Sequence, residues 1–124
     1  MKKIYKIVEN RINYLVIEED GCSNWENIIE HNFWYKIPKK YKKYKDIKFI
    51  INNKHNNLDI IIAYYRNRKE HNIYGSSCIS RKPSTGWYYN NWCIYGKEYF
   101  DMNEWSKKSN SIIRNKKIQV LNRI

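Results

Sequence analysis

The sequence predicts an α+β fold: a single small domain over residues 1–124, with a mainly antiparallel sheet and two short helices. Three observations support this prediction. A chain of 124 residues has room for one hydrophobic core. Short runs of β-branched and aromatic residues recur along it, separated by segments rich in Asn, Gly and Pro. Capping patterns start a helix at two places, near residues 24 and 102.

The chain opens with a predicted β-hairpin. Residues 4–9 and 13–19 are rich in β-branched and aromatic side chains, and the short gap between them suits a tight connection. Asp20 and Gly21 predict a turn that closes the second strand.

A helix and two central strands are expected next. Ser23 stands three residues before Glu26, a capping box that predicts a short helix over 24–31. Two apolar runs, 46–52 and 58–65, predict paired strands in the middle of the sheet. These two runs are the best candidates for the core.

The segment that follows predicts a loop, a strand and a second hairpin. Residues 66–72 are polar and predict a loop, and 73–80 predicts a strand with a bend at Gly75. After a turn over 83–86, an aromatic run leads to Asn90 and Asn91, which tolerate left-handed backbone. We therefore expect a hairpin whose two strands are 87–89 and 92–96, with the two asparagines as its turn.

The carboxy-terminal segment begins with a second helix signal. Asp101 precedes Glu104 by three residues, and Trp105 follows on the next turn, so a helix should begin near residue 102. Residues 111–124 alternate apolar and basic side chains in a pattern compatible with either a helix or a last strand.

The charge of the chain predicts an acidic partner. Lys and Arg number 24 against 12 Asp and Glu, a formal net charge of +12. The segment 36–48 holds seven lysines against Asp46 alone, and 107–124 holds six basic residues and no acidic one. The alternative is that these lysines only keep a small protein in solution.

Aromatic residues accompany the basic ones. Five Trp and twelve Tyr exceed what a core of this size needs, so some should be exposed and available for stacking or for a protein interface. In the lysine segment, the tyrosines could instead anchor a solvated stretch to the body of the protein. The predicted binding residues are Lys39, Lys40, Tyr41, Lys42, Lys43, Tyr44, Arg81, Lys82, Trp87, Tyr89 and Trp92.

No metal, cofactor or membrane contact is predicted. The three cysteines form no CxxC pair and should be buried, reduced thiols. A metal site is conceivable from Cys22, Cys78 and Cys93 with one of His31, His55 or His71, but their spacing does not suit zinc. No apolar run approaches 18 residues, and charges interrupt the amino-terminal apolar run, so we expect the protein to stay in the cytoplasm of the host cell.

Residues 71–105 resemble the short β-repeat proteins of phages and giant viruses. Units of that family resemble H-x-x-x-G-P-A followed by W-Y-x-N-G, and they often finish on G-K-x-Y. The matching positions are His71, Gly75, Trp87, Tyr88, Asn90, Gly96, Lys97 and Tyr99. Ser76 and Ser77 replace the Pro-Ala pair, Asn91 replaces the turn Gly, and one clear unit stands where the family usually stacks several. The resemblance implies viral origin, antiparallel hairpins and no catalytic residues.

A binding function is therefore favoured over catalysis. Ile, Lys, Asn and Tyr dominate while Ala occurs once, which indicates an AT-rich genome, as in phages, large DNA viruses and low-GC bacteria. The favoured hypothesis is a viral accessory protein that inhibits a host defence system, an anti-CRISPR or similar anti-defence protein, by binding an acidic host protein or protein–nucleic acid complex.

Two alternatives remain open. The first is direct RNA or DNA binding. The second is a metal-independent ribonuclease that uses two of His31, His55 and His71 as general base and acid. The sequence contains no GxSxG, P-loop or HExxH pattern.

Overall fold

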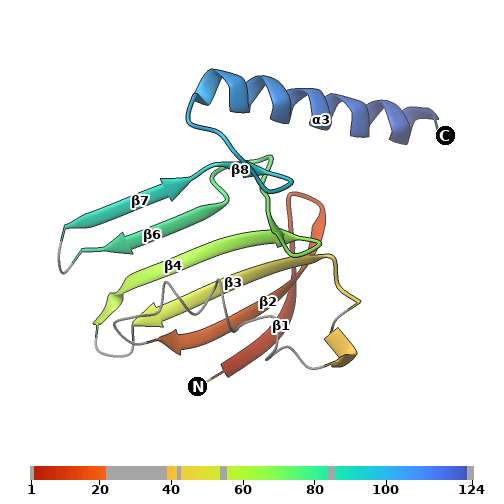
Figure 1. Ribbon diagram of the computed structural model, residues 1–124. Helices are drawn as coiled ribbons and strands as arrows, with labels where there is room; N and C mark the ends of the chain where they lie inside the picture. Colours follow the sequence, from red (N-terminus) through yellow and green to blue (C-terminus); the bar gives the residue numbers. More distant parts are fainter. Residues whose placement is uncertain (1, 22–38, 42, 54–55, 84–85, 123–124) are drawn as a thin grey trace.

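The computed structural model describes residues 2–21, 39–41, 43–53, 56–83 and 86–122 (Figure 1). Seven strands form one sheet in the order β1-β2-β3-β4-β6-β7, with β5 paired to β4, and β8 and β9 form a separate two-stranded sheet. The elements are β1 (Lys2–Glu9), β2 (Ile12–Gly21), η1 (Lys39–Tyr41), β3 (Asp46–Asn53), β4 (Asn56–Arg66), β5 (Lys69–Glu70), β6 (Cys78–Lys82), β7 (Trp87–Asn91), β8 (Cys93–Ile94), β9 (Lys97–Glu98) and α3 (Met102–Asn122).

The predicted first hairpin is confirmed. β1 and β2 are antiparallel and are joined by Asn10 and Arg11, whose φ angles of 52° and 64° are those of a tight type I′ connection. The predicted turn at Asp20 and Gly21 is wrong, because both residues belong to β2 and pair with β3. Pairing with a second strand keeps this end of β2 extended.

The two central strands are also confirmed. β3 and β4 are antiparallel neighbours in the middle of the sheet. Their inward-facing side chains join those of β2 in the larger core cluster, which consists of Leu15, Ile17, Ile47, Phe49, Ile51, Ile61 and Ala63. A second cluster, of Tyr14, Val16 and Tyr64, packs on the opposite face of the sheet. The inner strands are thus buried on both faces, as their continuous apolar runs predict.

The predicted fold class, α+β with two short helices, is wrong. The described residues are mostly sheet, and their α-helical content is α3 alone, which has 21 residues and is not short. The sheet is mixed rather than antiparallel, because β2 and β3 run parallel. A parallel neighbour needs a long crossover, and the connection between these strands spans residues 22–45. The predicted helix over 24–31 lies outside the described residues.

Two local predictions fail in the segment after β4. The expected loop over 66–72 contains a tight turn at Asn67 and Arg68, with φ angles of 50° and 65°, followed by β5. The expected strand over 73–80 begins only at β6, since Asn72 fixes the preceding loop. The side-chain amide of Asn72 donates to the Ser76 carbonyl (3.0 Å), and its oxygen accepts from the Tyr74 amide (2.9 Å).

The predicted hairpin around Asn90 and Asn91 is wrong as well. Both asparagines lie within β7, which pairs along its whole length with β6. The next turn comes later, at Tyr95 and Gly96, whose φ angles are 49° and 83°, between β8 and β9. The side chain of Asn91 donates to a Glu70 carboxylate oxygen at 2.6 Å, a long-range contact that helps to hold it in the strand.

The second helix begins where the sequence predicts. The Asp101 carboxylate accepts the Asn103 amide hydrogen bond at 2.8 Å, as an N-cap does. The helix continues to Asn122, so most of the segment left open between helix and strand is helical. Its buried and half-buried residues recur at a spacing of three or four: Trp105, Ser106, Ser109, Ile112, Ile113 and Lys116. Figure 1 shows α3 beside β8.

Candidate functional site

Part of the predicted lysine segment forms a defined surface at the β1 side of the sheet. We call it the lysine–tyrosine surface, and its residues are Lys6, Lys39, Lys40, Tyr41, Lys43 and Tyr44. Tyr41 closes η1, and its carbonyl accepts the Tyr44 amide hydrogen bond at 3.1 Å. Both tyrosines are half-buried and pack against the larger core cluster, with their ring centroids 6.3 Å apart. They anchor the lysine segment to the body of the protein.

Lysine ammonium groups lie over both rings. The Nζ atom of Lys40 is 4.9 Å from the Tyr41 ring centroid, and that of Lys43 is 5.7 Å from the Tyr44 centroid. Lys6, on β1, places its Nζ 5.3 Å from the same Tyr44 ring. A side-chain hydrogen bond to Tyr44 raises the pKa of Lys6, so this group stays protonated at neutral pH. All three cation–π contacts place positive charge beside the two tyrosine rings.

Lys6 is a residue that the sequence interpretation missed. It lies well before the lysine segment in the chain, and β1 brings it to Tyr44. Its position in a predicted strand close to Lys2 and Lys3 could have marked it as part of a basic surface. Only the fold shows that it contacts the ring of Tyr44. Lys42, one of the predicted binding residues, lies outside the described residues.

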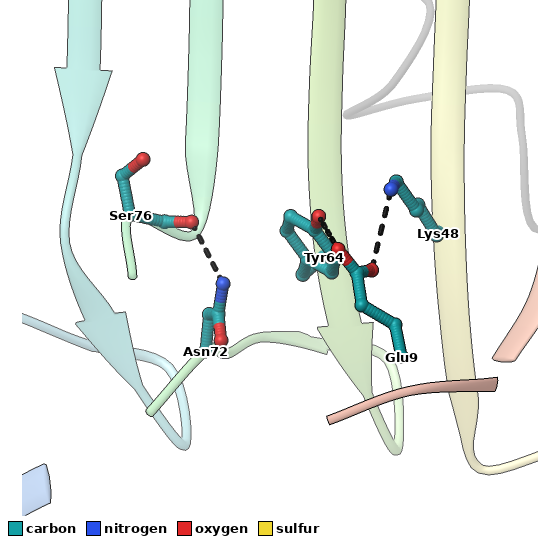
Figure 2. Close-up of polar contacts among 5 residues, drawn as sticks. All are labelled: Glu9, Lys48, Tyr64, Asn72 and Ser76. Carbon is teal, nitrogen blue, oxygen red and sulfur yellow. Dashed lines mark hydrogen bonds and ion pairs between the residues drawn. The ribbon is translucent and has the colours of Figure 1, made fainter. Parts of the chain in front are cut away.

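Two other charged residues of this segment, Asp46 and Lys48, form ion pairs. The Lys48 Nζ contacts a Glu9 carboxylate oxygen at 3.2 Å, and the Tyr64 hydroxyl donates to the other oxygen at 3.0 Å (Figure 2). Asp46, the acidic residue of the segment, binds the Arg66 guanidinium through both carboxylate oxygens at 3.1 Å. Because Asp46 is engaged, it does not neutralise the exposed lysines of the lysine–tyrosine surface.

The remaining predicted residues lie mainly at the opposite edge of the sheet. β6 carries Arg81 and Lys82, and β7 carries Trp87 and Tyr89. Strand β1 ends the sheet on one side and β7 ends it on the other (Figure 1), so the structure separates the predicted site into two surfaces. Arg81 is exposed, and Tyr89 is 44% exposed. Tyr88, which the sequence analysis did not select, is 65% exposed.

Trp92 belongs to neither surface. It is half-buried, and its ring meets the Trp105 ring edge-on with centroids 4.7 Å apart. Trp105 is on the first turns of α3, so this contact holds the helix against the small sheet of β8 and β9. The geometry therefore gives Trp92 a packing role.

His71 also has a packing role. Its Nδ1 atom accepts the Tyr95 amide hydrogen bond at 2.8 Å, and its ring stacks on Tyr95 with centroids 4.2 Å apart. Burial, together with the positive charges of Arg66 and Lys116, lowers the pKa of His71 to about 4. The imidazole is neutral at pH 7 and cannot serve there as a general acid. His31 and His55 lie outside the described residues.

A hydrogen-bonded polar network lies beside His71. The Ser77 hydroxyl donates to a Glu70 carboxylate oxygen (2.9 Å) and accepts the Cys93 amide (2.9 Å). Burial raises the pKa of the Cys93 thiol to about 12, and Cys93 is a free cysteine, as is the half-buried Cys78. Figure 2 shows the neighbouring contact between Asn72 and Ser76. These contacts satisfy polar groups within the fold.

In the part of the chain that the structure describes, no three His, Cys, Asp or Glu side chains come close enough to hold a metal ion. In the same residues, no helix combines the length and apolarity needed to cross a membrane.

Comparisons with protein-family models, with curated proteins and with solved structures each found no match. The resemblance of residues 71–105 to the viral β-repeat proteins therefore stays a prediction. One contact joins the first and the closing elements of that pattern. The Nδ1 atom of His71, in the first element, accepts a hydrogen bond from the backbone amide of Tyr95, which precedes the glycine of the closing element.

Proposed function

We propose that this protein acts by binding, and that its lysine–tyrosine surface docks on an acidic face of a host protein or protein–nucleic acid complex. The observation that carries the proposal is the arrangement of Lys6, Lys40 and Lys43 over two tyrosine rings that are anchored in the core. Positive charge held on a rigid support loses little freedom when it meets carboxylates, which favours specific docking over diffuse attraction.

The same arrangement favours a protein face over single-stranded nucleic acid. Proteins that bind single strands stack the bases on aromatic rings whose faces are free. Here the rings of Tyr41 and Tyr44 are half-buried, and the protein's own lysines lie over them. Direct RNA or DNA binding remains the second candidate, supported by the overall charge of +12.

The biological setting of the proposal is a viral inhibitor of a host defence system, an anti-CRISPR or similar anti-defence protein acting in the host cytoplasm. Its support is the AT-rich composition and the resemblance of residues 71–105 to viral β-repeat proteins. The ribonuclease alternative has less support, because His71 is bonded through Nδ1 and neutral at pH 7.

A charge-matched pair of variants tests the proposal. The first variant, Lys6→Gln with Lys40→Gln and Lys43→Gln, removes the three cations of the lysine–tyrosine surface. The control, Lys107→Gln with Lys108→Gln and Arg114→Gln, removes three exposed cations of α3. Both variants should fold like wild type, because exposed charges contribute little to stability. Urea unfolding checks this.

The readout is inhibition of purified CRISPR effector complexes in a DNA-cleavage assay. We expect inhibition of at least one complex, and a loss of roughly tenfold to a hundredfold in potency for the first variant with little change in the control. Fluorescence anisotropy titrations with RNA and DNA at low and moderate salt test the second candidate, direct nucleic-acid binding. Tight binding to nucleic acid alone, falling steeply with salt, would replace the proposal with direct nucleic-acid binding. Equal potency of the two variants would remove the lysine–tyrosine surface from the site.

A further inference from the structure

The two edges of the seven-stranded sheet differ in how well they are protected against pairing with another strand. An exposed sheet edge carries unpaired backbone groups that attract another strand, and proteins commonly block it with lysine, proline or a bulge. Strand β1 has three lysines, Lys2, Lys3 and Lys6. Strand β7, with the sequence WYYNN, has neither lysine nor proline, and its five pairs with β6 run without a register shift. Among the residues that the structure describes, β7 is therefore the edge with fewer features that block strand addition.

The side chains of β7 suit a protein strand better than a nucleic acid. Successive residues of a strand point to opposite faces, so Tyr88 and Tyr89 lie on different faces of the sheet. They are 65% and 44% exposed and flank the backbone edge from both faces. Two rings on opposite faces cannot form one platform for stacked bases, whereas they can both pack against the side chains of an added strand.

A shallow hollow lies beside this edge. It has a volume of about 480 Å³, and its lining includes Ile60, Arg81, Tyr88 and Asn90. Arg81 and Tyr88 are partners across β6 and β7, and Ile60 is the partner of Arg81 on β4, so these three share one face. Arg81 is exposed and is the charged residue of the lining. The hollow thus combines polar and apolar side chains with a single cation.

We propose that β7 takes an extended, acidic segment of a partner polypeptide as an additional strand of the sheet. The outer edge of β7, which pairs with no other described strand, supplies the hydrogen bonds, and Arg81 supplies a contact for a carboxylate. A second copy of this chain is a poor occupant, because each copy carries a net charge of +12 and the two would repel. This interface goes beyond the proposed function and lies at the far edge of the sheet from the lysine–tyrosine surface.

Three synthetic peptides test the proposal, each about ten residues long, the length of a long strand. The first alternates Glu with Val, the second alternates Lys with Val, and the third alternates Glu with Pro. The Glu-Pro peptide has the charge of the first, but every second residue lacks a backbone N–H and the prolines hold the chain near the polyproline conformation, so it should pair poorly as a strand. The measurement is amide hydrogen exchange of the isotope-labelled full chain, followed residue by residue by NMR.

We expect the Glu-Val peptide to slow exchange of outward-facing amides in β7 by about tenfold or more at saturation, and the other two peptides to leave them unchanged. Arg81→Gln should weaken binding of the Glu-Val peptide about tenfold, while the control Lys107→Gln should leave binding unchanged. The triple variant at Lys6, Lys40 and Lys43 should bind this peptide like wild type, so failure of one proposal is distinguishable from failure of the other.

Other outcomes would overturn the inference. If the Glu-Pro peptide slowed amide exchange as much as the Glu-Val peptide, charge alone would explain the effect. If no peptide slowed exchange in β7, strand addition would be excluded. Protection of β7 that rises with protein concentration, without peptide, would identify a second copy as the occupant. A response of Tyr88 and Tyr89 to single-stranded RNA, without slowed exchange, would assign the edge to nucleic acid instead.

Discussion

His71 shows how a residue that suggests chemistry can serve the fold. A histidine next to basic and polar residues is a reasonable candidate for acid–base catalysis. In the structure the residue is 6% exposed, and its ring stacks on Tyr95 and accepts a backbone hydrogen bond through Nδ1. Protonation of Nδ1 would break that hydrogen bond and place a charge beside Arg66 and Lys116. The folded protein therefore keeps this imidazole neutral.

This neutrality predicts a dependence of stability on pH. The pKa of His71 is lowered from 6.5 to about 4 in the folded protein, so between these values the unfolded chain binds more protons. The free energy of unfolding should fall as the pH drops from about 6.5 to about 4, with His71 contributing up to about 3 kcal/mol of that loss. Urea unfolding at several pH values measures it.

His71→Asn is the matched variant for this prediction. Asn retains a hydrogen-bond acceptor for the Tyr95 amide but does not titrate. The variant should be less stable than wild type at neutral pH, and the difference should shrink toward about pH 4. Parallel stability curves for the two proteins over this range would contradict the assigned role.

At the scale of elements, α3 depends on a tertiary contact. α3 is rich in Ser and Asn, which favour helices weakly, so much of its stability should come from packing of its apolar face. Its Asp101 cap fixes where it begins. The edge-on contact of Trp105 with Trp92 then joins it to the sheet of β8 and β9. The cap can be recognised in the sequence because it involves neighbouring residues. The contact between the two tryptophan rings cannot, because it depends on how the chain folds.

Removing that contact should loosen the helix. We expect Trp105→Ala to lower the free energy of unfolding by about 2 kcal/mol and to speed amide exchange along α3. Trp92→Ala should act similarly, and the double variant should be less destabilised than the sum by about 1 kcal/mol, the coupling of an aromatic pair. Phe100→Ala is the control, since Phe100 is 88% exposed. Additive effects of the two tryptophan variants would contradict a direct contact.

At the scale of the whole molecule, the order of the strands determines which side chains share the core and which surfaces lie at the edges of the sheet. The larger core cluster spans β2, β3 and β4, and Phe49 of β3 is fully buried at its centre, with its ring edge-on to Tyr65 at 5.5 Å. The two candidate surfaces lie at the two edges on either side of this core. Changes at one edge can therefore be tested without disturbing the other.

The shared core predicts a global effect for one substitution. Phe49→Ala should lower the free energy of unfolding by about 3–5 kcal/mol, because it leaves a cavity between the central strands. Tryptophan fluorescence and circular dichroism should report one coincident transition in urea. Val8→Ala on β1 is the control, since Val8 is 71% exposed. A variant as stable as wild type would show that these strands do not form the core.

The sequence alone determined the features that depend on neighbouring residues. The first hairpin, the two central strands and the start of α3 follow from periodicity and capping, which act over a few residues. The Asn-Arg pair forms a tight turn twice, at Asn10 and at Asn67, and its recurrence was a signal that could have identified the second turn. The density of positive charge in the lysine segment is likewise a property of the sequence.

Only the tertiary structure decided which of these features meet. The parallel pairing of β2 and β3, the place of Asn90 and Asn91 within β7, and the packing of Trp92 on Trp105 all depend on residues distant in the chain. Lys6 joins the lysine–tyrosine surface for the same reason, whereas Arg81 is carried to the other edge. Strand pairing is chosen by the burial of whole faces of the sheet, and no local pattern contains that choice.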